Sequence, residues 1–213
     1  MSGDGSTLGR RRFLRFLVMA PAVVFAGSRV RWLSGAAAAW AGEPDVATAS
    51  FTPECADDDE PTPSETAGPF FKPRSPLRAS LLEKGMPGTP IVVQGRVFSR
   101  GCKPLANVLL DFWHADDSGE YDNQGFRCRG HQFTDAAGRY TLETVVPGLY
   151  PGRTRHIHVR VQAAKGRVLT TQLYFPGEPR NQDDGLFRPE LLMAVKDEGH
   201  AKQARFHFLL DAA

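Results

Sequence analysis

The chain has 213 residues, of which 41% are hydrophobic and 23% are charged, as is typical of a globular protein. A formal net charge of +2 gives no case for nucleic-acid binding, and no apolar run reaches the roughly 18 residues of a membrane-spanning helix. Three cysteines are too few for a disulfide scaffold and lack the Cys-x-x-Cys spacing of structural zinc sites.

The first 41 residues have the layout of an export signal. A basic flank precedes an apolar stretch at residues 16–26 and a run of small residues at 36–41. The Arg-Arg-x-Phe-Leu-Arg string at residues 10–15 resembles the twin-arginine signal, which sends folded, cofactor-loaded proteins across the bacterial inner membrane. A short amphipathic or core helix is the alternative interpretation. Export predicts a periplasmic or secreted location, with the twin-arginine machinery as a partner.

Charge and composition divide the chain into three parts. Residues 1–41 carry six of the 26 basic residues and one of the 24 acidic residues, so the basic excess lies in the expected signal. We expect cleavage after Ala41, with Ala26 as the second candidate. Residues 42–63 contain an Asp-Asp-Asp-Glu run and several prolines, which predicts a flexible linker. Residues 64–213 are then one domain.

The expected domain is built from short strands separated by turn residues. Turn signals about every 8–12 residues, with period-two patterning between them, favour an all-β sandwich or barrel. We predict a single-domain antiparallel β-sandwich with short helices. The expected strands cover residues 91–98, 107–113, 139–145, 156–161 and 168–175, and the two brief helices cover 76–84 and 189–195.

The strand expected at residues 156–161 carries two histidines on one face. Successive side chains in a strand point to opposite faces, so the three aliphatic residues of this strand share the core face. His156, His158 and Arg160 then share the other face. Imidazoles at positions i and i+2 stand roughly 7 Å apart, which is close enough to bind one ion. A pair of exposed polar residues is the alternative.

The next expected strand presents polar side chains to the same face. Thr170, Gln172 and Tyr174 alternate with apolar residues. If a hairpin closes around residues 163–167, Gln172 lies opposite His158 in an antiparallel pair. A register slip of one residue would reverse this arrangement.

Two tyrosines stand in turns next to these strands. Tyr121 lies in a polar turn that follows the strand at 107–113, where no core needs an aromatic side chain. Tyr150 lies in a Pro-Gly turn that also carries Arg153 towards the entrance of the histidine strand. A surface tyrosine, a turn aromatic packed on the sheet and a surface arginine are the alternatives.

These motifs together resemble one family. The chain contains Thr-Ala-Gly-Pro-Phe-Phe at 66–71, Phe-Trp-His-Ala-Asp running on to a tyrosine at 112–121, the turn at 147–153, His-Ile-His at 156–158 and Thr-Gln-Leu-Tyr-Phe at 171–175. In this order they are similar to the intradiol ring-cleavage dioxygenases of the catechol and protocatechuate class. The similarity extends from about residue 63 to residue 179.

The resemblance implies a metal centre. It would be a non-haem Fe(III) ion held by two tyrosinates and two histidines, with a solvent hydroxide completing the shell. On this sequence the ligands would be Tyr121, Tyr150, His156 and His158. A phenol with a pKa of about 10 becomes a good ligand once a hard cation displaces its proton. Two anionic oxygens favour the ferric over the ferrous state.

The resemblance also implies a reaction. The two adjacent hydroxyls of an aromatic diol would bind the iron, with Tyr150 released to act as a base, and O2 would cleave the bond between the hydroxyl-bearing carbons. The product would be a muconate-type dicarboxylate. Arg153 would stabilise the negative charge that develops on the ring. Gln172 would hydrogen-bond near the reacting hydroxyl, and Tyr174 would line the same face.

Two departures from the cytosolic members of the family bear on the substrate. The gap between tyrosine and histidine at residues 151–155 is short where those enzymes often carry a longer insertion, and Glu-Thr-Ala-Gly at 65–68 replaces the commoner Gln-Thr-Glu-Gly. Catechol, protocatechuate, hydroxyquinol and substituted diols therefore all stay open. The rival interpretation is a non-catalytic exported β-sandwich binding module. A copper or zinc hydrolase would need a motif such as His-Glu-x-x-His, which is absent.

The cysteines and the assembly state leave further questions. After export, Cys102 and Cys128 are a candidate pair, because they flank the segment that carries Tyr121, and Cys55 would then be an unpaired thiol. A closed loop of that size stabilises the fold by roughly 3–4 kcal/mol in the chain-entropy model. No coiled-coil period or long apolar edge marks an interface, so the oligomeric state stays open.

Overall fold

The computed structural model describes Cys55 and residues 59–211, all of which belong to one compact unit, Ala47–Ala213. The expected signal, residues 1–41, and most of the expected linker lie outside the described residues. Within the described part of the chain, no helix is both long and apolar enough to cross a membrane.

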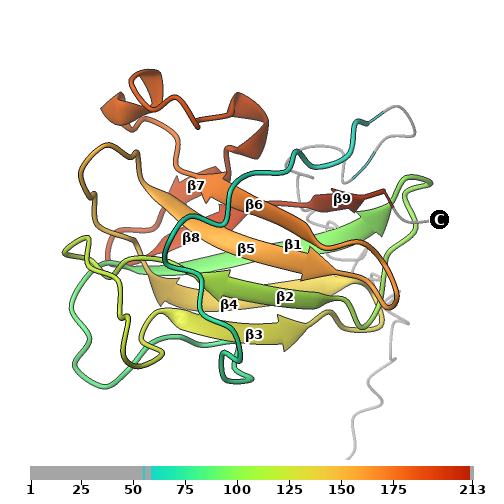
Figure 1. Ribbon diagram of the computed structural model, residues 1–213, viewed down its shortest axis with the longest axis horizontal. Helices are drawn as coiled ribbons and strands as arrows, with labels where there is room; N and C mark the ends of the chain where they lie inside the picture. Colours follow the sequence, from blue (N-terminus) through green and yellow to red (C-terminus); the bar gives the residue numbers. More distant parts are fainter. Residues whose placement is uncertain (1–54, 56–58, 212–213) are drawn as a thin grey trace, which may run out of the picture. The chain divides into compact units, whose positions relative to one another are not determined.

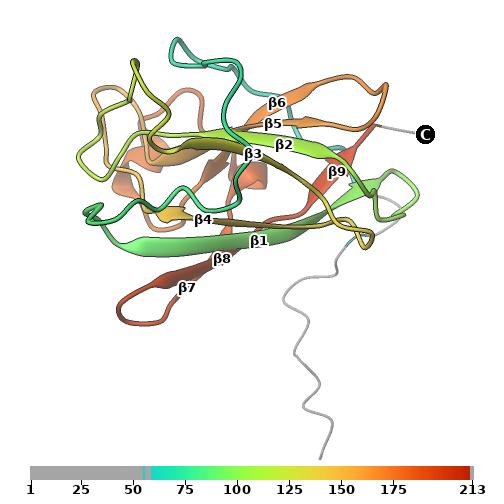
Figure 2. The ribbon, with the colours of Figure 1, turned by 90° about the horizontal axis from the view of Figure 1, so that it is seen from below.

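In the described part of the chain, nine strands form two sheets that pack face to face as a sandwich (Figures 1 and 2). One sheet has the order β4-β1-β8-β7, with β9 also pairing β1, and the other has the order β3-β2-β5-β6. The strands are β1 (Pro90–Ser99), β2 (Leu109–Trp113), β3 (Arg129–Phe133), β4 (Arg139–Val145), β5 (His156–Gln162), β6 (Leu169–Tyr174), β7 (Ala194–Asp197), β8 (Lys202–Arg205) and β9 (Phe208–Leu210). Two short 3-10 helices, η1 (Pro179–Gln182) and η2 (Pro189–Leu191), follow β6.

The core lies between the two sheets and follows the period-two pattern of the sequence. Ile157, Val159 and Val161 of β5 are fully buried on the inner face, and Val93 and Leu142 meet them from the opposite sheet. Alternation of this kind places one side of each strand in the core and leaves the other free for different chemistry. The predicted all-β sandwich is therefore confirmed.

Four strands of the sandwich were not predicted from the sequence. Three of them, β7, β8 and β9, have three or four residues each, which is too short for a period-two pattern. The fourth, β3, reads Arg-Gly-His-Gln-Phe and lacks the apolar alternation of a typical strand. β8 and β9 also pair with β1 in parallel, so the sheet is mixed rather than purely antiparallel.

The helix expected at residues 76–84 is wrong. The segment is extended and forms isolated bridges from Leu77 to His131 and from Ser80 to Glu143. The backbone amide of Leu81 donates to Glu143 O at 2.8 Å, and the Leu81 side chain is fully buried. Hydrogen bonds to β3 and β4 thus replace the intrahelical bonds that the segment would otherwise make.

The helix expected at residues 189–195 is correct only in its first turn. The 3-10 helix η2 ends at Leu191, and β7 begins three residues later. Leu191 and Met193 are buried in the core, and the amide of Met193 donates to Tyr174 O at 3.0 Å. Buried apolar residues two positions apart indicate an extended chain. The chain then continues into β7, which pairs with β8.

The expected cysteine pairing is also wrong. Cys55 and Cys102 form a disulfide with a Cα–Cα distance of 5.6 Å, and Cys128 is a buried free thiol. Cys102 lies in the turn before β2, whereas Cys128 precedes Arg129, which pairs with the last residue of that strand. The five residues of β2, about 16 Å of extended chain, lie between the turn that carries Cys102 and the end of the strand where Cys128 is found. The disulfide instead ties the linker to the turn between β1 and β2.

Residues 59–72, which we call the arm, cross the outer face of the four-stranded sheet (Figures 1 and 2). Reciprocal hydrogen bonds join Thr62 to Leu209, at 3.0 and 2.8 Å. Farther along, Glu65 N donates to Thr170 O at 2.7 Å and Gln172 Nε2 donates to Thr66 O at 3.0 Å. These contacts hold the arm over β6 and β5.

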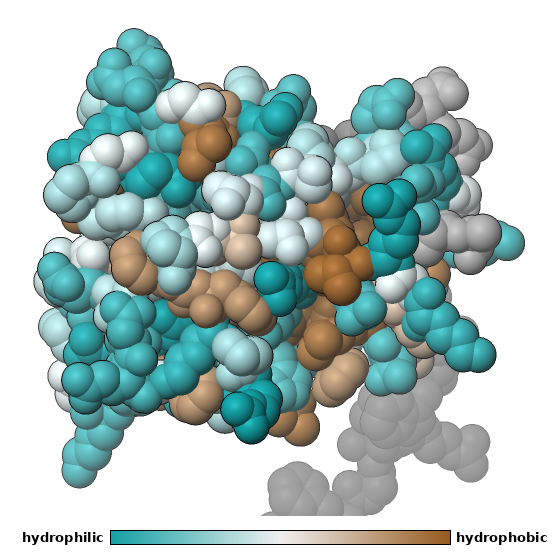
Figure 3. Space-filling view, viewed as in Figure 1, coloured by the Kyte–Doolittle hydropathy of each residue, from teal (hydrophilic) through white to brown (hydrophobic). Residues whose placement is uncertain are grey.

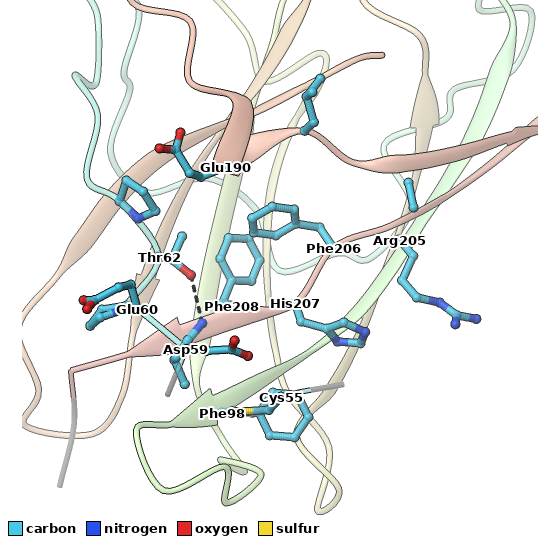
Figure 4. Close-up of a pocket in the computed structure, with 15 residues that line it drawn as sticks. Cys55, Asp59, Glu60, Thr62, Phe98, Glu190, Arg205, Phe206, His207 and Phe208 are labelled. Carbon is cyan, nitrogen blue, oxygen red and sulfur yellow. Dashed lines mark hydrogen bonds between the residues drawn. The ribbon is translucent and has the colours of Figure 1, made fainter. Parts of the chain in front are cut away.

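The start of the arm covers a cavity of about 450 Å³ next to β9 (Figure 4). Phe98, Phe206 and Phe208 contribute aromatic rings to its wall, and the acidic side chains of Asp59 and Glu60 lie at the arm's side. Seen from the four-stranded sheet, the surface mixes hydrophilic and apolar residues (Figure 3). The large apolar side chains exposed on the described part of the molecule are Leu77, Leu82, Phe133, Val168 and Leu186.

Candidate metal centre

The two histidines of β5 lie on the outer face of the sheet, as the strand pattern predicts. They are not exposed to solvent, however: His156 is 3% exposed and His158 is 1% exposed. Gly68 of the arm lies against the His158 ring, with the position of a Cβ only 3.4 Å from its Cε1 atom. The indole of Trp113 stacks on the same ring with a centroid distance of 4.9 Å and an interplanar angle of 2°. Apolar neighbours therefore enclose the histidine pair.

The two imidazoles turn their Nε2 atoms towards each other, 3.1 Å apart. His156 Nδ1 lies 2.7 Å from Thr154 O, and because a carbonyl oxygen can only accept, Nδ1 carries the hydrogen. Burial lowers the pKa of His156 to about 4 and the pKa of His158 well below its ordinary value. At neutral pH His156 Nε2 therefore offers a lone pair, which is the state in which imidazole binds a metal ion.

The two predicted tyrosines join the histidines in one cluster of rings. The ring centroids of Tyr121 and Tyr150 are 5.7 Å apart, Tyr150 lies 5.7 Å from His156, and Tyr121 lies 6.5 Å from His158. In the part of the chain that the structure describes, no three His, Cys, Asp or Glu side chains gather in a way that could hold a metal ion. The partners of the imidazole pair are phenols.

Close approach of two glycines brings the tyrosine-bearing loops together. Gly119 has a φ of +91°, and a Cβ there would lie 2.4 Å from Leu149 O. A Cβ on Gly148 would lie 2.2 Å from Gly119 N. The amide of Gly148 also donates to Asp116 O at 2.6 Å. Only glycine fits at both positions, because any side chain would separate the loops.

The Tyr121 hydroxyl is buried and has no hydrogen-bond partner of standard geometry within the described residues. Burial, with a smaller contribution from the Tyr150 hydroxyl, raises the pKa of Tyr121 above its ordinary value. Phe70 of the arm stacks on the ring at 4.3 Å, and the Arg129 guanidinium lies 5.9 Å from the ring centroid. An orphaned phenol beside two imidazole nitrogens matches a donor set that a hard cation would complete.

A hydrogen-bonded network places Arg153 next to Tyr150. Arg153 Nη1 lies 3.5 Å from the Tyr150 hydroxyl, and Nη2 donates to Gln172 Oε1 at 2.6 Å. The Tyr174 hydroxyl lies 3.2 Å from the same Gln172 oxygen and 3.4 Å from Arg153 Nη2, and it donates to Leu186 O at 2.8 Å. Gln172 pairs with His158 in the register between β5 and β6, as predicted.

All of the predicted site residues thus come together in one place. Tyr121, Tyr150, His156, His158, Arg153, Gln172 and Tyr174 form a continuous set of neighbours. Sequence reasoning missed Asp184, whose carboxylate accepts from Arg153 Nε at 2.9 Å, and Arg129, a fully buried cation near Tyr121. No motif marked either residue, since Asp184 lies in a turn and β3 was not recognised.

Comparison with known proteins identifies the family to which the chain belongs. A family model described as "Dioxygenase" matches residues 66–212, which include the whole site. Catechol 1,2-dioxygenase 2 from Acinetobacter lwoffii is 34% identical over 163 residues, which are 63% of this chain and 59% of that protein. The beta chain of protocatechuate 3,4-dioxygenase from Burkholderia cepacia is 34% identical over 164 residues, covering 63% of this chain and 70% of that protein.

A solved structure is more similar still. The dioxygenase domain of a dioxygenase–carbohydrate-binding protein fusion from Streptomyces sp. SirexAA-E is 60% identical, with a TM-score of 0.71, and the match covers 72% of this chain and all of that one. The sandwich, the paired phenols and imidazoles and these similarities define one class of protein. The chain belongs to the intradiol ring-cleavage dioxygenase family.

Proposed function

We propose that this protein is an exported non-haem Fe(III) dioxygenase that cleaves a catechol-type ring between its two hydroxyl-bearing carbons. The ligands would be Tyr121, Tyr150, His156 and His158. One observation carries the proposal: two buried imidazole nitrogens face each other at 3.1 Å beside a buried phenol that has no hydrogen-bond partner of standard geometry within the described residues. The reaction adds both atoms of O2 to the diol, and the product is a muconate-type dicarboxylic acid.

The donor set suits a ferric ion better than the softer alternatives. Two phenolate oxygens are hard and anionic, and two imidazoles add neutral nitrogen donors. When bound, Fe(III) would supply Lewis acidity that lowers the pKa of both phenol ligands and activates the bound diol towards O2. Burial opposes ionisation of Tyr121, so a neighbouring cation is what makes its phenolate form accessible.

The chain's own residues would handle protons and charge. Tyr150 is the phenol next to Arg153, and its oxygen would accept a proton from a substrate hydroxyl. Arg153 keeps a fixed positive charge 3.5 Å from that oxygen, where negative charge develops. Gln172 accepts a hydrogen bond from Arg153 through its carbonyl oxygen and donates one to Thr66 O through its amide nitrogen, so it orients the guanidinium. The arm excludes water from the histidine side.

The substrate would be a small aromatic diol. Relatives of this chain are named for catechol, protocatechuate, chlorocatechol and hydroxyquinol. The segment between Tyr150 and His156 is short. Phe70 of the arm, which stacks on Tyr121, would therefore border the substrate.

Export is part of the proposal and rests on residues 1–41. Their basic, apolar and small-residue order supports transport by the twin-arginine machinery to the periplasm or the medium. The disulfide between Cys55 and Cys102 is consistent with an oxidising compartment. The mass of the mature chain distinguishes cleavage after Ala41 from cleavage after Ala26.

The test is purification with iron, followed by anaerobic addition of catechol and then O2. We expect about one iron per chain, a reddish colour from tyrosinate-to-iron charge transfer, and a muconate-type product. Tyr150→Phe should lower turnover at least about tenfold or weaken iron binding, because the phenol that accepts the proton is gone. Tyr140→Phe is the matched control, because Tyr140 donates to Phe206 O within the core, away from the site.

Two results would contradict the proposal. Unchanged turnover in Tyr150→Phe would remove that residue from the reaction. A folded, colourless protein that takes up no iron would favour the rival function, a non-catalytic exported β-sandwich binding module.

A further inference from the structure

A buried carboxylate next to the candidate site has no role in the reaction described above. Asp184 lies just beyond η1, in the segment that follows β6, and its side chain is 3% exposed. It faces the turn that carries Tyr150 and Arg153. A buried carboxylate is retained only where charge-assisted hydrogen bonds offset its desolvation.

Three donors converge on this carboxylate. Oδ2 accepts from Arg153 Nε at 2.9 Å and from the amide of Thr154 at 2.8 Å, and Oδ1 accepts from the amide of Leu186 at 2.9 Å. The charged partner, Arg153, is itself only 13% exposed at its side chain. Asp184 therefore joins its own loop to the start of β5 and to the guanidinium in one contact set.

The opposite edge of the same guanidinium faces the candidate site. Arg153 Nη2 donates to Gln172 Oε1 at 2.6 Å, and Nη1 lies 3.5 Å from the Tyr150 hydroxyl. The guanidinium is planar and rigid, so holding Nε determines where both Nη atoms lie. Asp184 on one edge and Gln172 on the other fix the plane.

The backbone of the turn does not provide this orientation by itself. Pro151 and Gly152 are exposed, and a Cβ on Gly152 would contact nothing within 4 Å. Arg180 Nη1 donates to Tyr150 O at 3.0 Å, which holds the main chain but not the arginine side chain. An arginine side chain loses rotamer entropy when it is held in place, so it needs a dedicated contact to stay in one conformation.

We propose that Asp184 is a positioning residue that orients the Arg153 guanidinium towards the Tyr150 hydroxyl and the substrate site. The inference rests on the proposed function for its effect on turnover, but the orientation itself is a property of the iron-free chain. An alternative role, in which Asp184 only stabilises its own loop, predicts a loss of stability without any effect that depends on Arg153.

The first measurement uses the mature chain, without the expected signal and without iron. The Nε–H signal of Arg153, assigned in ¹⁵N-arginine-labelled protein by comparison with Arg153→Ala, should be protected from solvent exchange in the wild type. Asp184→Asn should increase its exchange rate at least about tenfold, because the amide has no negative charge and only one of its two ends accepts hydrogen bonds. Asp183→Asn, a change at the exposed neighbouring residue, should leave the signal unchanged.

The second measurement uses the iron-loaded enzyme. Asp184→Asn should lower kcat about 10- to 100-fold with KM changed less than about threefold, while iron content and the charge-transfer band stay as in the wild type. In an Arg153→Ala background, Asp184→Asn should cause less than about a twofold further loss, since its effect acts through Arg153. If Asp184→Asn does not fold, Asp184→Glu takes its place, because it displaces the carboxylate by one methylene. The exchange rate, kcat, KM and the double variant with Arg153→Ala are then measured with Asp184→Glu.

The outcomes separate this inference from the proposed function. An unchanged Nε–H signal, an unchanged kcat, or losses that simply add in the double variant would each overturn the inference. A protected signal that is lost in Asp184→Asn, in a protein that shows no ring cleavage, would leave the orientation of Arg153 standing and remove the proposed function.

Discussion

At the scale of single residues, the site is defined by burial of groups that usually prefer water. The outer face of β5 would be an ordinary polar surface if the arm did not cover it. Enclosure by Trp113 and Gly68 instead keeps His158 dry, and the resulting low pKa keeps its imidazole neutral. Burial also leaves the Tyr121 hydroxyl without a partner inside the described residues. A cation would suit both groups, because it binds the lone pair of a neutral imidazole and stabilises the phenolate form of a tyrosine.

The contact between Gly119 and Leu149 is the residue-scale feature that brings the two tyrosines together. Gly119→Ala would place a Cβ 2.4 Å from Leu149 O at a φ of +91°. We expect it to lower the free energy of unfolding by at least about 2 kcal/mol and to reduce iron content, because the loops must separate. Thermal unfolding and iron analysis measure the two effects.

Gly199→Ala is the matched control for that substitution. Gly199 also has a positive φ, of +84°, but a Cβ there would meet nothing within 4 Å. Gly199→Ala should lower the free energy of unfolding by only about 1 kcal/mol, which is the effect of the backbone conformation alone, and should leave the iron content unchanged. A Gly119→Ala protein that binds iron like the wild type would show that the loop contact does not control the site.

At the scale of elements, strands provide the rigid part of the site and loops provide the rest. The register of β5 and β6 sets His158 against Gln172, and the arm then bonds to β6 through Thr66. Tyr121 and Tyr150 come from loops that join strands, so their positions depend on loop packing. Residues on rigid strands are held more accurately than residues on loops, which is why the loop residues need dedicated contacts such as the one to Arg153.

The disulfide between Cys55 and Cys102 ties the chain ahead of the arm to the turn between β1 and β2. Removing this disulfide, whose cysteines are 47 residues apart, should destabilise the fold by about 4 kcal/mol in the chain-entropy model. A variant with Cys55→Ser and Cys102→Ser should unfold at the same denaturant midpoint as reduced wild type, and both should unfold below the oxidised protein. Equal midpoints for oxidised and reduced wild type would contradict a stabilising role for the disulfide.

At the scale of the whole molecule, the sandwich holds several neutral histidines in places where charge is costly. His114 is 1% exposed, with Nε2 2.7 Å from Thr144 Oγ1 and Nδ1 2.6 Å from Ala115 O. Burial lowers the pKa of His114 to about 4, and that of His156 to about 4 as well. The unfolded chain binds protons on these groups at a higher pH than the folded chain does, because ordinary histidine has a pKa of about 6.5.

The iron-free protein should therefore lose stability as the pH falls from about 6.5 to about 4. In this window the unfolded state binds more protons, so the free energy of unfolding falls as the pH falls, by up to about 1.4 kcal/mol per pH unit for each such histidine. His114→Gln should reduce this slope by one such contribution, and His200→Gln, at an exposed position, should not. Urea unfolding between pH 4 and pH 7.5 measures the slope, and identical slopes in all three proteins would contradict the assignment.

Much of the fold and the site follows from local patterns in the chain. Period-two alternation around His156 and His158 identified the strand, its inner face and its outer face, and the hairpin length gave the pairing with Gln172. The same pattern failed where segments are short or lack apolar alternation, as in β3 and β7 to β9. Residues 76–84 were misjudged because their backbone bonds are made to β3 and β4 rather than locally.

By itself, the sequence determined the all-β class and the faces of β5 and β6, because each of these depends on neighbours along the chain, and the resemblance to a family supplied the residues of the candidate site. Only the tertiary structure decided that Cys55 pairs with Cys102, that the arm buries the histidines and that Asp184 holds Arg153. These contacts join segments tens of residues apart. Which distant groups meet depends on the path of the chain and on close packing of its loops, and neither quantity is written in a local pattern.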